Sequence, residues 1–271
     1  MPGPANRVAS SSRLLDLLTL ERVEVNLFLT PVLHEGPSGL YGGQVAAQAL
    51  RAAAATVDPQ RHPHSLHGYF LSRGDASRPV LLTVYQDRDG RSYSNRRVIA
   101  VQEGRVIFNM AASFHIVEPG VDYQAHTVPE VTPPDELPDS GIHGLLVGVE
   151  LRIPEQAQPD QKWPSRVWLR ARDALGDDIL NACALTYVSD MFTGLAGTPG
   201  AERLGPPTSL DHAVWFHRRV SLDDWVLMDL QPESIAGGRG MYTGRIFGKD
   251  GRLAAGIAQE SVWRTEPPSP R

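Results

Sequence analysis

The apolar stretch at residues 177–194 is the feature that most constrains how this chain can fold. Asp177 and Asp178 open it, where a helix N-terminus favours negative charge, and Gly194 is a typical helix stop. The side chains between them are so largely apolar that we expect a helix buried on nearly every side. Asp190, in the last turns, is the exception. Because a buried carboxylate is costly unless it is hydrogen-bonded or paired, Asp190 needs a partner or a function.

Composition limits the class of protein. With 271 residues, 41% hydrophobic and 21% charged, we expect one large globular domain or two of ordinary size. No apolar run approaches the roughly 20 residues of a membrane span. Residues 1–7 lack the apolar core of a secretory signal, so we expect a cytoplasmic protein. A net charge of −5 argues against a general nucleic-acid binder, and one cysteine excludes an internal disulfide framework.

The first half of the chain predicts two helices and an antiparallel meander. Hydrophobic periodicity and turn signals place helices at 13–20 and 41–57, and strands at 23–30, 65–72, 79–86, 92–102 and 105–117. The second of these helices carries small residues on all sides, mostly alanine, so strands can approach it closely. It is expected to be buried as well.

A proline-rich segment at 118–164 divides the chain and predicts a linker, with a short helical turn around 141–147. The second half then repeats the first: a strand at 166–172, the buried helix, and strands at 210–220, 225–233, 240–247 and 252–263. We expect residues 265–271 to form a loose tail. The hairpin turns include 103–104, 237–240 and 249–251.

The two halves can be aligned residue by residue. The matched pairs are Gly104 with Gly251, Ser65 with Ser209, and Gly43 with Thr186, at offsets of 147, 144 and 143 residues. Offsets this similar indicate a duplicated unit. The predicted fold class is α+β, with two tandem units at 13–117 and 165–264, each an antiparallel sheet curled around a central helix.

The alignment singles out polar residues that only the second half carries on its core elements. Asp190 falls opposite Ala47, and Gln259 falls opposite Ala112. Each of these two residues, with Ser209, is a site candidate. The alternative that each side chain only satisfies a neighbouring backbone group stays open.

Six motifs, in order along the chain, resemble the acyl-CoA thioesterase II family. They are Leu40-Tyr-Gly-Gly-Gln-Val45, His64-Ser-Leu-His-Gly-Tyr-Phe-Leu71 with Arg73-Gly-Asp75, Asp89-Gly-Arg-Ser-Tyr-Ser-Asn-Arg-Arg-Val98, Tyr187-Val-Ser-Asp190, Ser209-Leu-Asp-His-Ala-Val-Trp-Phe-His217 and Ala258-Gln-Glu260. The resemblance implies a double hotdog fold and hydrolysis of fatty acyl-CoA without metal, cofactor or covalent intermediate. It implies Asp190, Gln259 and Ser209 as the catalytic set, with Ser209 standing where the family usually has threonine.

The resemblance also implies a role for each of these three residues and for several arginines. Asp190 would accept a proton from the attacking water, while Gln259 and Ser209 would orient that water. Candidates for the CoA phosphates are Arg73, Arg91, Arg96, Arg97 and Arg239. For any single one of them, a solvated arginine on an edge strand is the competing interpretation. Exposed sheet edges favour a homodimer or a larger homo-oligomer.

Three alternatives to a thioesterase remain: an acyl-CoA-binding protein that does not hydrolyse, an enoyl-CoA hydratase of hotdog type, and a structural protein. A hydratase would want a histidine paired with the aspartate on the buried helix and its loop, and none follows Asp190 there. Weaker motifs carry no chemistry. His62, His64 and His67 match no metal-binding spacing. Ser209, Asp211 and His212 lie along one strand and point to different faces, so they do not predict a triad. Mid-helix Cys183 is expected in the core.

Overall fold

The computed structural model describes residues 13–33, 39–142, 146–157, 161, 163–199, 201 and 207–263. The predicted tail at 265–271 lies outside the described residues. Within the described part, no helix is long and apolar enough to cross a membrane.

The described strands form one antiparallel sheet, in the order β1-β2-β4-β5-β6-β3-β10-β13-β12-β11-β8-β7, with β9 beside β13. From the first half come α1 (Leu14–Leu18), β1 (Glu21–Glu24), β2 (Leu27–Leu29), α2 (Gly42–Ala54), β3 (Arg61–Phe70), β4 (Leu81–Asp89), β5 (Tyr93–Gln102) and β6 (Arg105–Ile116). The rest are η1 (Pro134–Glu136), β7 (Val149–Arg152), β8 (Arg166–Ala171), α3 (Asp178–Ser189), β9 (Thr208–Ser209), β10 (Asp211–Phe216), β11 (Val226–Ala236), β12 (Arg239–Gly248) and β13 (Leu253–Val262).

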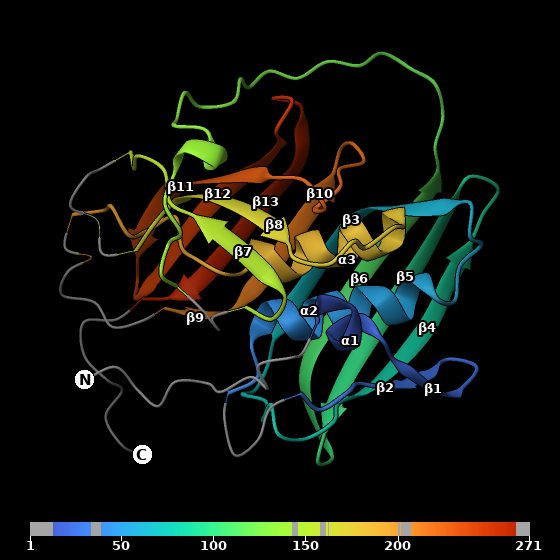
Figure 1. The fold of residues 1–271 in the computed structure, drawn as a ribbon. Helices are drawn as coiled ribbons and strands as arrows, with labels where there is room; N and C mark the ends of the chain where they lie inside the picture. The colour runs from blue at the N-terminus through green and yellow to red at the C-terminus, as the bar shows by residue number, and fades with distance from the viewer. Residues whose placement is uncertain are drawn as a thin grey trace, which may run out of the picture.

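Helices α1, α2 and α3 gather on one face of the curved sheet, with α2 and α3 packed against each other (Figure 1). Alanines of α2 are almost fully buried, which lets β3 to β6 approach that helix closely. The side chain of Asp177 caps α3 by accepting a hydrogen bond from the Leu180 N–H at 2.7 Å. The prediction of two buried helices is confirmed.

The two halves meet at the centre of the sheet, where β3 pairs antiparallel with β10 and Ala213 lies opposite His67. Each strand therefore ends beside the start of the other. As a result, the loops that follow β3 and β10 emerge at opposite ends of these strands. Each loop can therefore line a cavity at its own end.

Helix α3 ends five residues before the predicted stop at Gly194. Its last helical residue is Ser189, and Asp190 is the C-cap, with φ −94° and ψ 8°. The helix ends there because the chain tightens: the Met191 N–H bonds to the Val188 carbonyl, only three residues back. Asp190 therefore projects from a helix end rather than from a helical turn.

The helix bounds also correct the alignment of the two halves. Helix α2 begins at Gly42 and has Ala55 as its C-cap, while α3 begins at Asp178 and has Asp190 as its C-cap. The counterpart of Asp190 is thus Ala55. The predicted match with Ala47 is wrong, because small residues around α2 gave the sequence comparison no register.

The strand register corrects a second match. The predicted offset of 147 residues holds for β6 and β13, so Ser261 of the second half corresponds to Phe114 of the first half. The cross-strand partner of Ser261 is Ser209, and that of Phe114 is Pro63. Ser209 therefore corresponds to Pro63, and its predicted match with Ser65 is two residues out.

Three smaller predictions also change. The strand expected at 23–30 is two strands, because a turn separates β1 from β2. The segment expected to be a linker contains β7, which pairs with β8; four residues between prolines were too short to show an alternating pattern. A short helical turn lies at η1, and the turn predicted around 141–147 falls on a segment of which residues 143–145 lie outside the described residues. The predicted hairpin at 237–240 is confirmed, since Gly237 and Gly238 adopt positive φ between β11 and β12.

Arg96 of β5 is a structural residue. Its side chain is 2% exposed, and it donates hydrogen bonds to the Thr56 hydroxyl at 2.9 Å, the Arg88 carbonyl at 3.1 Å and the Asp89 carboxylate at 2.9 Å. A guanidinium so enclosed has no surface to offer a phosphate. The prediction that Arg96 contacts CoA is therefore wrong: its fixed hydrogen bonds join β5 to the residues that follow α2.

We expect Arg96→Met to lower the free energy of unfolding by about 3 kcal/mol, because it leaves buried acceptors without a donor. Urea unfolding followed by circular dichroism measures the change. Arg97→Met is the matched control: Arg97 neighbours Arg96 but is exposed and paired with Asp87, so we expect about 1 kcal/mol or less. Equal effects of the two substitutions would contradict the structural role of Arg96.

Candidate active site

Asp190 lies between two cavities at the end of α3. The larger, of ≈ 580 Å³, is lined by the start of α2, by the loop after β3 with Arg73, and by Asp190 and Ser209. The smaller, of ≈ 260 Å³, is lined by Asp190, Ser209, Gln259 and largely apolar neighbours that include Trp163, Met191, Phe192 and Tyr242. A group held at Asp190 could thus extend into both.

The structure brings the three predicted catalytic residues together. The Ser209 hydroxyl donates a hydrogen bond to Asp190 Oδ1 at 3.1 Å. The Gln259 amide Nε2 lies 2.8 Å from the same oxygen and 2.7 Å from Ser209 Oγ. These residues come from a helix end, β9 and β13, which are far apart in sequence. The side chains therefore converge on one carboxylate, as expected for a site.

The start of α2 supplies further donors. The Gly43 N–H donates a hydrogen bond to Asp190. The positive N-terminal end of α2 therefore faces the carboxylate of the residue that ends α3. A Cβ atom at Gly42 would lie 2.5 Å from Asp190 Oδ2, and one at Gly43 would lie 2.4 Å from the Tyr187 carbonyl oxygen. Glycine is required here because the two helix ends approach too closely for a side chain.

His212 is a residue of this site that the sequence did not reveal. It is fully buried on β10, with Nδ1 against Gln259 Oε1 and Nε2 2.7 Å from Ser189 Oγ. An ionised Asp190 can only accept hydrogen bonds, so the Gln259 NH₂ must face Asp190 and its oxygen must face His212. The consistent tautomer has the proton on Nδ1, donated to Gln259. The Ser189 hydroxyl lies within reach of both the Thr186 carbonyl, at 3.0 Å, and His212 Nε2, and in this tautomer it turns its proton to Nε2. His212 thus fixes which way the Gln259 amide points.

The signal that marks His212 is its strand position. It lies two residues before Val214, an inward-facing core residue of β10, so His212 must also face the core. Treating Ser209, Asp211 and His212 only as a possible triad hid this position. The structure gives no such triad, because His212 bonds to Gln259 and Ser189.

Burial sets the protonation of the two titratable groups. It raises the pKa of Asp190 above its usual value, an effect opposed by the nearby His212 and by hydrogen bonds from Gln259, Ser209 and Gly43. Burial also lowers the pKa of His212, which keeps the imidazole neutral near pH 7. A carboxylate whose pKa is shifted toward neutrality is a stronger base than an exposed one.

The five candidate arginines do not gather at this site. Arg73 lines the larger cavity. Arg97 is paired with Asp87 and lies over the Tyr85 ring, and Arg239 is paired with Glu260 at 2.8 Å. Arg91, Arg96, Arg97 and Arg239 are all absent from the lining of both cavities around Asp190. Arg73 is the one candidate that the geometry favours.

Other candidate chemistry does not appear near Asp190. Among the described residues, no group of three histidine, cysteine, aspartate or glutamate side chains is arranged to hold a metal ion. Cys183 is fully buried in α3, and burial raises the pKa of its thiol to about 12, which keeps it protonated and unreactive.

The fold and site define a hotdog-type thioester hydrolase, and comparisons with known proteins agree. Residues 33–115 match the family model described as acyl-CoA thioesterase N-terminal domain, and residues 125–263 match that of the C-terminal domain. The Homo sapiens protein acyl-coenzyme A thioesterase 8 is 34% identical over 282 residues, covering 93% of this chain and 88% of that protein.

Solved structures give the same result. An acyl-CoA thioesterase II from Mycobacterium marinum is 38% identical, with a TM-score of 0.79 over 95% of this chain and 99% of that one. A protein of unknown function with a hotdog fold, from Alicyclobacillus acidocaldarius, has a TM-score of 0.76 at 19% identity over 94% and 98% of the two chains, which supports the fold alone. This chain belongs to the acyl-CoA thioesterase family.

His212→Leu tests the positioning of Gln259. Leucine should fit, because Leu66 fills the corresponding inward position of β3 and is equally buried. Without the imidazole the Gln259 amide can rotate, so we expect kcat to fall roughly 10- to 100-fold with little change in KM. Steady-state thiol release measures both constants, with His67→Leu on the exposed face of β3 as the control. An unchanged kcat in a folded His212→Leu protein would contradict this role.

Proposed function

We propose that this acyl-CoA thioesterase hydrolyses its substrate at Asp190, with Ser209 and Gln259 orienting the water. The observation that carries the proposal is the convergence of Ser209 and Gln259 on Asp190 Oδ1 at the junction of two cavities. The carboxylate is held in one orientation, beside space for a thioester and a water molecule. That arrangement suits general-base catalysis.

The reaction can be written through these groups. Asp190 takes a proton as the water oxygen bonds to the thioester carbon, and the carbonyl oxygen becomes an oxyanion. The backbone N–H of Gly42, at the start of α2, would stabilise that oxyanion, aided by the positive end of the helix. The carbon–sulfur bond then breaks, and the CoA thiolate takes the proton from Asp190. Acid and CoA are the products.

The two cavities suit the two sides of the thioester. The larger holds Arg73 at its lining and would take the CoA arm, with Arg73 attracting its phosphates. The smaller, with Trp163, Phe192 and Tyr242, would enclose the fatty acyl chain near the carbonyl. Asp190, Ser209 and Gln259 border it, which would place the scissile bond between them.

Two competing functions have less support. An enoyl-CoA hydratase would need a histidine paired with the aspartate and facing the substrate, whereas His212 is fully buried behind Gln259. An acyl-CoA-binding protein without hydrolysis would have no use for a carboxylate held by three donors.

We infer the same organisation for the whole chain as the sequence predicts. It comprises an N-terminal hotdog unit at 13–117, a connecting segment at 118–164, and a C-terminal unit at 165–264 that carries the catalytic residues. Each unit would be a sheet curled around its own helix, α2 or α3. The packing of α2 against β3 to β6 supports the first. A cytoplasmic location and a homo-oligomer assembled through exposed sheet edges remain part of the proposal.

Asp190→Asn tests the catalytic role. We expect kcat for thiol release from an acyl-CoA series to fall at least about 100-fold, because asparagine cannot accept the proton. The melting temperature at pH 7 should not fall: the pKa of Asp190 is raised on folding, so ionised Asp190 opposes folding and its removal costs nothing. Asp178→Asn, at the other end of α3, is the matched control and should keep full activity. Equal activity of the two variants would rule out this site.

The pH profile gives a second test. Because the folded pKa of Asp190 is raised, kcat should decline on the acid side with an apparent pKa above the ordinary aspartate value of about 3.9. Stopped-assay rates across the acid range, with circular dichroism at each pH to verify folding, measure this limb. A constant kcat down to that ordinary value would show that a buried carboxylate is not the base.

A further inference from the structure

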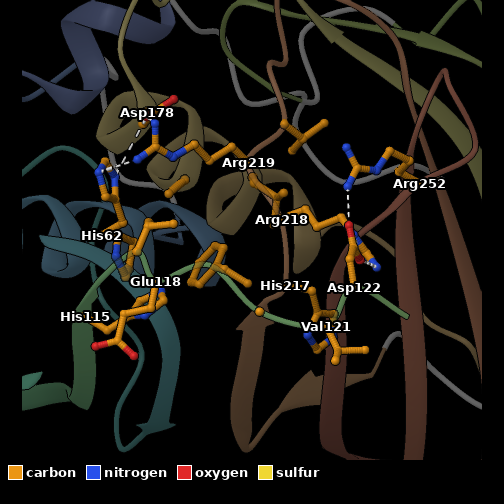
Figure 2. Close-up of a pocket in the computed structure, with 17 residues that line it drawn as sticks. His62, His115, Glu118, Val121, Asp122, Asp178, His217, Arg218, Arg219 and Arg252 are labelled. Atoms are coloured by element: carbon orange, nitrogen blue, oxygen red, sulfur yellow. Dashed lines mark hydrogen bonds and ion pairs between the residues drawn. The ribbon is translucent and has the colours of Figure 1, made fainter. Parts of the chain in front are cut away.

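A third cavity, of ≈ 510 Å³, lies at the opposite end of α3 from Asp190 (Figure 2). Its lining includes Ala182 and Leu185 of α3, Phe216 at the end of β10, and Val220 in the loop that follows β10. Its size is close to the ≈ 580 Å³ of the larger active-site cavity. None of the chemistry described above uses it.

The sheet register makes this cavity the counterpart of the active-site cavity. The loop after β3 lines the active-site cavity, and the loop after β10 lines the third cavity. Arg73 lies three residues after the end of β3, and Arg219 lies three residues after the end of β10. The start of α2 borders one cavity and the start of α3 borders the other. This correspondence rests on the tandem organisation proposed above.

The catalytic groups have no equivalents in the third cavity. Alanine, proline and alanine stand at the corresponding positions, because Ala55 matches Asp190, Pro63 matches Ser209, and Ala112 matches Gln259. The carboxylate, the hydroxyl and the amide of the active site are thus all missing at these three positions. In addition, Arg96 pairs across the strands with Ala112, and its buried guanidinium is hydrogen-bonded to Thr56, the residue after Ala55. Hydrolysis by the proposed route cannot occur here.

The start of α3 is also changed. The first residue of α2 at the active-site cavity is Gly42, whereas the first residue of α3 is Asp178, whose carboxylate lies 2.7 Å from Arg219 Nη1. Arg219 in turn donates a hydrogen bond to His62 Nε2 at 2.8 Å. Figure 2 shows these three side chains together on one side of the cavity. Asp178 therefore occupies the place where helix amides would stabilise an oxyanion, while a cation remains at the rim.

A second cationic group faces the cavity from its other side. Arg218 and Arg252 share the single carboxylate of Asp122, with Arg252 Nη2 2.5 Å from it (Figure 2). Two guanidinium groups on one carboxylate leave a local positive charge. Across the whole lining, the three arginines are balanced by Glu118, Asp122 and Asp178, so an incoming phosphate must displace a carboxylate. Asp122 is exposed and belongs to the segment after β6, so an incoming anion can compete with it for these arginines.

We propose that this cavity binds a second acyl-CoA molecule without hydrolysing it. The acyl-pantetheine arm would lie on the apolar surface of Leu185, Phe216 and Val220, and the CoA phosphates would bind the arginines at the rim. The inference deepens the proposed function, because it assigns the same substrate class to a cavity that kept its size and its arginine but lost its catalytic groups.

Isothermal titration of the full chain with a non-hydrolysable ketone analogue of acyl-CoA counts the sites. We expect two analogue molecules per chain in the wild type. Arg219→Ala should weaken one site about tenfold and leave kcat/KM unchanged at low substrate. Arg73→Ala, the matched control at the corresponding position, should weaken the other site and lower kcat/KM. Ala182→Phe, which fills the cavity, should leave one analogue molecule per chain.

A single analogue molecule per wild-type chain would overturn the proposal. So would two molecules per chain that persist in folded Ala182→Phe protein. These results are independent of catalysis: if the wild type binds two analogue molecules yet releases no thiol from acyl-CoA, the hydrolytic assignment at Asp190 fails and the second site stands.

Discussion

The carboxylate of Asp190, held where the end of α3 meets the start of α2, is the interaction on which the site depends. A carboxylate removed from water must be hydrogen-bonded, and here the donors are the Gly43 N–H, the Ser209 hydroxyl and the Gln259 amide. The N-terminal end of α2 carries partial positive charge and favours an ionised Asp190. The C-terminal end of α3 carries partial negative charge and opposes it. Burial raises the pKa of Asp190, and the donors keep it from rising further.

The rest of the fold holds those donors in place. Gln259 cannot rotate because His212 binds its oxygen, and His212 is fixed in turn by Ser189 at the end of α3. The hydrogen bonds from Asp190 to Gln259, His212 and Ser189 therefore begin and end on the same helix. They pass through β10 and β13, which are paired in the sheet. A shift of one residue between these strands would turn His212 or Gln259 toward solvent. The fixed orientation of the Asp190 carboxylate is thus a consequence of strand register.

The sequence predicted the buried helices, the meanders and the three residues that converge on the site, because periodicity and an isolated polar group on an apolar element are local signals. It could not predict the correct register between the halves: alanines around α2 match many offsets, and Asp190 was paired with Ala47 instead of Ala55. It did not reveal His212 either, since its partner Gln259 is distant in sequence. Five arginines were equivalent in the sequence, and only the fold separates buried Arg96 from Arg73 at the cavity.

The central claim is that Asp190 activates water and does not attack the thioester itself. A single turnover in water enriched in heavy oxygen, followed by mass spectrometry of the acid and of the peptide containing Asp190, tests it most directly. Water activation predicts that the heavy oxygen appears in the product acid during the first turnover and that Asp190 stays unlabelled. Heavy oxygen in the Asp190 carboxylate, with an unlabelled acid, would reveal an acyl-enzyme anhydride and contradict the account.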